Sequence, residues 1–92
     1  MTRFLIERYV EGIGSISEEQ WKEINRRSGA SAKNMAPHST WIESYVTQDY
    51  LYCIFEAEDE GWARAHADSE GFPCGRVLEI KDEFRAKRED PS

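Results

Sequence analysis

The 92-residue sequence lacks most of the features that assign a short chain to a known class of protein. Its two cysteines, Cys53 and Cys74, are too few and too far apart for a disulfide framework or a CxxC metal knuckle. No apolar run approaches the roughly 20 residues that a membrane-spanning helix needs. Glu7 also interrupts what would be the apolar part of a signal peptide. We therefore expect a cytoplasmic protein in which Cys53 is a small buried apolar residue and Cys74 an exposed thiol.

Familiar catalytic motifs are missing as well. The segment Gly12-Ile13-Gly14 has neither the later glycine nor the lysine of a phosphate-binding loop, and it fits a turn better. There is no G-x-S-x-G elbow, and the spacing of Cys53 and His66 does not indicate a catalytic dyad. The sequence does not decide whether the protein is an enzyme, but the lack of these catalytic motifs makes enzymatic activity the less favoured interpretation.

The composition indicates a folded, acidic domain. Eighteen acidic against twelve basic side chains give a net charge of −6, which disfavours nucleic acids and anionic membrane surfaces and suits cations. The chain is 39% hydrophobic and 12% aromatic, enough to form a core. We expect one domain over residues 1–84, followed by a charged, partly disordered tail over residues 85–92.

Turn and capping signals divide the chain into six elements. Strands are predicted over residues 3–10, 40–46, 51–57 and 77–81. Ser17 and Gln20 form a capping box that starts a helix ending near residues 33–34. A second helix runs from a cap at Asp59 to Gly71. The order β-α-β-β-α-β predicts an α+β, ferredoxin-like sandwich, with both helices on one face of an antiparallel four-stranded sheet.

Alternation along the strands separates a face covered by the helices from an open face. The covered set is small to medium in size and nearly all apolar, and Arg8 is its one misfit. The open set mixes carboxylates with aromatics: Leu5, Glu7, Tyr9, Trp41, Glu43, Tyr45, Tyr52, Ile54, Glu56, Val77, Glu79 and Lys81. In water it would form a larger aromatic patch than an ordinary monomer exposes. We therefore predict a homodimer, paired like a dimeric α/β barrel, whose open faces enclose a cavity.

Aromatics with a few carboxylates can bind a divalent metal ion or a small organic ligand. The candidate metal ligands are Glu7, Glu43, Glu56 and His66. The candidate contacts to an organic ligand are Trp41, Tyr45 and Tyr52. A plainer interpretation is that the glutamates form a solvated sheet face and that His66 packs against the sheet edge. Because His66 lies on a helix, it could join Glu7 only at a sheet edge or across the dimer.

Several blocks of the sequence carry a resemblance to a known family. The segments Trp41-Ile42-Glu43-Ser44-Tyr45-Val46-Thr47 and Leu51-Tyr52-Cys53-Ile54-Phe55-Glu56-Ala57 resemble the hairpin signature of a small bacterial domain family, of formerly unknown function, that includes a nickel-binding protein. The opening Phe4-Leu5-Ile6-Glu7-Arg8 is similar to that family's first strand. The blocks His66-Ala67, Gly71-Phe72-Pro73 and Arg76-Val77 are similar to the end of its second helix and the segment beyond. Together these blocks span nearly the whole domain.

The resemblance implies a ferredoxin-like fold, a homodimer and binding of divalent metal, nickel first, with no established enzymatic activity. Residues that match the family's pattern are Glu7, Tyr45, Cys53 and His66. Glu43 stands where many members are expected to carry a histidine. A carboxylate there keeps a ligand but shifts the preference from nickel toward magnesium, calcium or manganese.

Three hypotheses follow. The first is a small metal-binding or metal-sequestering dimer, with Tyr45 as a donor behind the ligands. The second is an enzyme similar to small cofactor-free monooxygenases, which would hold an aromatic ligand in the cavity and use a buried carboxylate as base. The third is a partner-binding module whose open face is only an interface.

Overall fold

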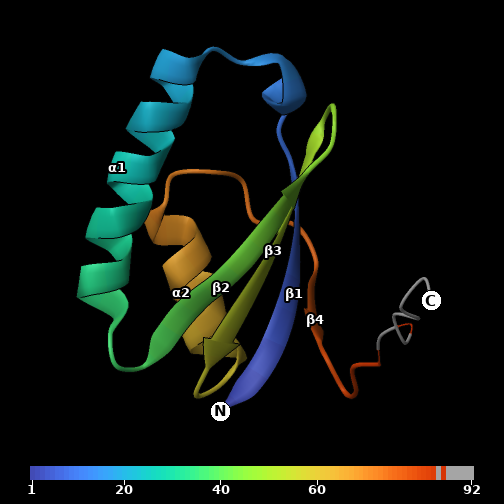
Figure 1. The fold of residues 1–92 in the computed structure, drawn as a ribbon. Coiled ribbons are helices and arrows are strands. Elements are labelled where there is room, and N and C mark those ends of the chain that lie inside the picture. Colours follow the sequence, from blue (N-terminus) through green and yellow to red (C-terminus); the bar gives the residue numbers. More distant parts are fainter. Residues whose placement is uncertain (85, 87–92) are drawn as a thin grey trace, which may run out of the picture.

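The computed structural model describes residues 1–84 and 86, and its elements follow the predicted order. They are β1 (Thr2–Tyr9), the short 3-10 turn η1 (Ile13–Ser15), α1 (Glu18–Met35), β2 (Ser39–Val46), β3 (Tyr50–Ala57), α2 (Glu60–Ser69) and β4 (Val77–Glu79). The strands form an antiparallel sheet in the order β2-β3-β1-β4, with both helices on one side (Figure 1). This α+β arrangement is compatible with the predicted ferredoxin-like fold. The predicted tail over residues 85–92 lies outside the described residues, apart from residue 86.

Both helices begin where the capping signals place them. Ser17 accepts a hydrogen bond from the backbone of Gln20, whose side chain accepts one from the backbone of Ser17. Asp59 accepts one from the backbone of Trp62 at 2.9 Å. Such caps satisfy backbone N–H groups that a helix cannot pair internally. Neither helix is long and apolar enough to cross a membrane, as far as the described chain shows.

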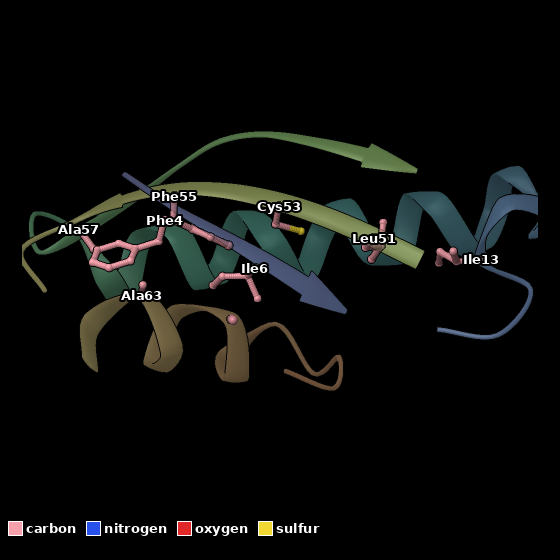
Figure 2. Packing of buried hydrophobic residues seen from close by; sticks show 9 residues of the cluster. Phe4, Ile6, Ile13, Leu51, Cys53, Phe55, Ala57 and Ala63 are labelled. Carbon is pink, nitrogen blue, oxygen red and sulfur yellow. The ribbon is translucent and has the colours of Figure 1, made fainter. Parts of the chain in front are cut away.

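The buried cluster lies between the sheet and the helices, as the covered set predicts (Figure 2). Side chains of one alternating set on β1 and β3 form most of it, and Ala63 and Ala67 of α2 close it. Small residues in the second half of α1 allow a close approach to α2, where the Ser31 hydroxyl contacts that of Ser69. The cluster comprises Phe4, Ile6, Ile13, Leu51, Cys53, Phe55, Ala57, Ala63 and Ala67.

Arg8, the exception in the covered set, is fully buried beneath the segment that leaves α2. Its guanidinium binds the Glu70 carboxylate at 2.6 Å. It also donates hydrogen bonds to the carbonyl groups of Ala67, Phe72 and Pro73. The arginine therefore fastens β1 to the end of α2 and to the loop beyond it.

A β-bulge in β2 corrects the predicted assignment of residues to faces. Trp41 lies opposite Phe55 and Glu43 opposite Ile54, which leaves Ile42 as an extra residue without a partner on β3. A bulge of one residue exchanges the two faces for everything before it. Trp41 was expected on the open face, but it lies on the side of the helices.

The register of β4 also differs from the prediction. Val77 lies opposite Ile6 and Glu79 opposite Phe4, so both belong to the helix side, and Leu78 faces the open side with Leu5. Val77 packs against the core, while Glu79 is exposed at the sheet edge. The strand spans only Val77–Glu79, so Lys81 lies beyond it. An edge strand this short gives alternation too few residues to fix its face.

Candidate functional site

The open face of the sheet is the candidate site, and the strand register defines its members. Its middle is apolar, with Leu5 and Ile54 paired across β1 and β3. Aromatic side chains lie toward the β2–β3 turn, and charged ones are spread over the rest. The face comprises Arg3, Leu5, Glu7, Tyr9, Thr40, Glu43, Tyr45, Tyr50, Tyr52, Ile54, Glu56 and Leu78.

All four tyrosines of the chain gather on this face. The rings of Tyr9 and Tyr50 meet edge to face with centroids 5.3 Å apart, and those of Tyr50 and Tyr52 stack at 5.7 Å. Tyr45 lies opposite Tyr52 in the register. Tyr9 and Tyr45 are 53% and 55% exposed. Tyr50 was predicted in the turn, but β3 begins with it, so the patch is larger than alternation indicated.

Two of the three predicted carboxylates on this face are ion-paired. Glu7 accepts hydrogen bonds from Arg76 at 2.8 and 3.2 Å, and this guanidinium lowers the pKa of the Glu7 carboxyl. Glu56 binds Arg3 at 3.0 Å. Glu43 has no ion-pair or hydrogen-bond partner for its side chain among the described residues. It is therefore the open-face carboxylate that is free to take a cation.

His66 lies on the other side of the sheet. Its side chain is fully buried between α2 and β3, with its ring centroid 4.6 Å from that of Phe55. Nδ1 shares a hydrogen bond of 2.9 Å with the Ser39 hydroxyl, and Nε2 is buried without a partner. The structure thus does not bring His66 together with Glu7, Glu43 and Glu56 in one chain. Over residues 1–84 and 86, no three His, Cys, Asp or Glu side chains converge as a metal site.

The buried imidazole gives stability a predictable pH dependence. Burial lowers the pKa of His66 from its usual value of 6.5; the charge of Glu70 opposes this effect and that of Arg8 adds to it. The unfolded chain then binds the proton more tightly than the folded one. We expect the free energy of unfolding to fall as the pH drops below about 6.5 and to stop falling below the lowered pKa. Urea unfolding at several pH values across this window measures the slope.

Two variants isolate the contribution of His66. His66→Phe is expected to flatten the pH dependence because it removes the titrating group. Ser39→Ala is the matched control, since it removes only the hydrogen bond and keeps the slope while lowering stability. An unchanged slope in His66→Phe would show that other groups carry the acid sensitivity.

Trp41, Tyr45 and Tyr52 do not form the predicted aromatic platform, because the bulge turns Trp41 away. Trp41 instead lines a cavity of about 70 Å³ on the helix side, where its Nε1 donates to the Ser44 hydroxyl at 2.9 Å. That hydroxyl donates to Cys53 Sγ at 3.1 Å. Burial raises the pKa of the Cys53 thiol, which is 4% exposed, and keeps it unreactive. Cys53 is therefore the buried small residue that was predicted.

Comparisons with known proteins agree with the observed fold. Residues 4–80 match the model of a family described as nickel-responsive protein SCO4226-like. The crystal structure of SCO4226 from Streptomyces coelicolor A3(2) superposes with a TM-score of 0.67 at 16% sequence identity, covering 89% of this chain and 99% of that one. At that identity, the likeness shows a shared fold. No curated protein matches the sequence significantly.

Proposed function

The chain belongs to the SCO4226-like family of nickel-responsive proteins, and on that premise we propose that it binds a divalent metal ion, nickel first, in the cytoplasm. The binding species would be a homodimer in which two open faces meet like the halves of a dimeric α/β barrel, and its role would be non-enzymatic. The observation that carries this proposal is Glu43, a carboxylate on an apolar and aromatic face that has no ion-pair or hydrogen-bond partner among residues 1–84 and 86.

A second copy of the chain would supply the additional metal ligands that the described residues of one chain do not bring together. The described donors of a single chain do not converge on one point, but a two-fold axis presents each donor twice. The ligands we propose are the open-face carboxylates, with Glu43 first. Glu7 and Glu56 are further candidates, which would have to break their ion pairs with Arg76 and Arg3 to bind the metal. His66 is fully buried on the helix side, so we expect its substitution to act on folding rather than on metal affinity.

The exposed aromatic patch supports the dimer. Tyr9 and Tyr45 are more than half exposed, and Tyr50 is 39% exposed beside them. Ile54 and Leu5 lie on the same face of the sheet as these rings. Exposed aromatic and apolar side chains gathered on one face of a small protein commonly mark an interface. Both copies would present the same patch, as a two-fold interface requires.

The test is calorimetric titration of tag-free apo protein with nickel, and in parallel with manganese, while sedimentation reports the oligomeric state. We expect a dimer that binds nickel with defined stoichiometry. Glu43→Gln should weaken binding about tenfold or more, because it removes the charge at nearly constant shape. Ile54→Lys should dissociate the dimer and abolish metal binding with it, because it places a charge in the middle of the interface.

Two matched controls make the outcome decisive. Glu19→Gln removes an exposed carboxylate from the first turn of α1, outside the open face, and should leave nickel affinity unchanged. Trp41→Lys changes a 45% exposed aromatic on the opposite side of the sheet and should leave the dimer intact. Equal nickel affinity in wild type, Glu43→Gln and Ile54→Lys would refute the proposed site. A monomeric wild type would refute the dimer.

A further inference from the structure

A second hollow lies on the helix side, away from the open face. It is a groove of about 370 Å³ between the first half of α1 and the chain that joins β1 to α1 through η1. Small-ligand sites in proteins typically occupy about 300 to 1,000 Å³ and have mostly apolar linings. The apolar side chains that line this groove are Val10, Ile13, Ile16, Ile24 and Phe72.

One charged side chain in the groove, Arg27, differs from the other described arginines in its hydrogen bonding. Among the arginines that the structure describes, Arg27 alone donates no hydrogen bond to a carboxylate or carbonyl group. Its Nε is buried without a partner, and its guanidinium lies over the Phe72 ring, 5.2 Å from the centroid. The other described arginines each bind a carboxylate: Arg3, Arg8, Arg26, Arg64 and Arg76.

The carboxylate best placed to neutralise Arg27 is already engaged. Glu23 lies one helical turn earlier and also lines the groove. Both of its oxygens are taken by Arg26, at 3.0 Å from Nε and 2.5 Å from Nη2. The groove therefore has mostly apolar walls, with Gln20 and Glu23 as its other polar lining residues, and a half-buried cation that no described carboxylate contacts. A buried polar atom without a partner, such as Arg27 Nε, is costly. An arriving anion can pair with the terminal N–H groups of the same guanidinium.

We propose that this groove binds a small amphipathic anion, with a carboxylate on the Arg27 guanidinium and an apolar body along Val10, Ile13 and Ile24. A guanidinium presents paired N–H donors that match the two oxygens of a carboxylate. The net charge of −6 repels anions at long range. Affinity must therefore come from contact within the groove, so both the apolar body and the anionic head are required.

The experiment is calorimetric titration of the full chain with octanoate, and separately with octanol, in the absence of metal. We expect saturable binding of one octanoate per chain with a dissociation constant of about 1 mM or tighter, as befits a ligand of this size. Octanol, which has the same apolar body and no charge, should bind at least about tenfold more weakly. Arg27→Gln should reduce octanoate affinity by a similar factor.

Arg64→Gln is the matched control, since Arg64 is an exposed α2 arginine that pairs with Glu60 and does not line the groove. It should bind octanoate like the wild type. The proposal is overturned if millimolar octanoate does not saturate the wild type, if octanol binds equally well, or if folded Arg27→Gln keeps its affinity. Should Arg27→Gln fail to fold, the comparison of octanoate with octanol on wild type decides. Because this site does not use the open face, its failure would leave the metal proposal unaffected.

Discussion

Replacing Arg8 with methionine is expected to lower the free energy of unfolding by about 3 to 5 kcal/mol. The substitution would leave the Glu70 carboxylate buried without its cation, which is the costly way to break a buried ion pair. It would also remove the donors for the carbonyl groups of Ala67, Phe72 and Pro73. Small domains are stable by about 5 to 15 kcal/mol, so the variant would be close to unfolding. Urea unfolding followed by circular dichroism measures the loss.

Arg3 provides the matched control on the same strand. Its ion pairs with Glu56 and Glu83 are partly exposed on both sides, and such pairs contribute little to stability. Arg3→Met should therefore be mild. The double variant Arg8→Met with Glu70→Met should recover part of the loss, because it removes the stranded charge as well. If Arg8→Met costs no more than Arg3→Met, Arg8 does not fasten β1 to α2.

Replacing Gly75 with alanine is expected to cost about 1 to 3 kcal/mol. A Cβ atom at this position would lie 2.5 Å from the carbonyl oxygen of Glu7. That oxygen also accepts a hydrogen bond from the backbone N–H of Gly75 at 2.9 Å. The two backbone segments therefore cannot move apart without breaking this hydrogen bond. The obstacle is backbone rather than a flexible side chain, which makes relaxation expensive. Thermal and urea unfolding both report the change.

Gly29→Ala is the same substitution at another position, and we expect it to raise the free energy of unfolding instead of lowering it. Nothing lies within 4 Å of a Cβ built at Gly29, which is exposed within α1. Alanine is favoured over glycine in a helix interior by about 0.5 to 1 kcal/mol, so this variant should be more stable than wild type. Equal effects of the two substitutions would contradict the steric explanation for Gly75.

Local signals predicted the elements well, because their causes lie within a few residues of one another. The capping box at Ser17 and the cap at Asp59 need only their own helix turns, and both are present. The element order then limits the possible sheet arrangements to few. Arg8 was marked as an exception by alternation alone, but its partners at the end of α2 are distant in sequence, so its role required the tertiary structure.

The candidate site was harder to predict, since it depends on which way each strand faces. Ile42 is apolar and β-branched, so the sequence gives no sign that it is the extra residue of a bulge. One inserted residue moved Trp41 to the other side, while Glu43 and Tyr45, beyond the bulge, kept their predicted face. Glu43 could be proposed as a ligand from sequence, but its lack of an ion-pair partner in the described part of the chain could not be predicted.

The bulge at Ile42 also places the tryptophan and tyrosine side chains on opposite sides of the sheet. With Trp41 turned, all three tryptophans are on the helix side: Trp21 and Trp41 line the cavity beneath α1, and Trp62 of α2 stacks on His38. All four tyrosines are on the open face. The tyrosine and tryptophan contributions to near-ultraviolet spectra therefore arise on opposite sides of one sheet. Tyrosine absorbance follows events on the open face, and tryptophan emission follows the layer of helices, without any attached label.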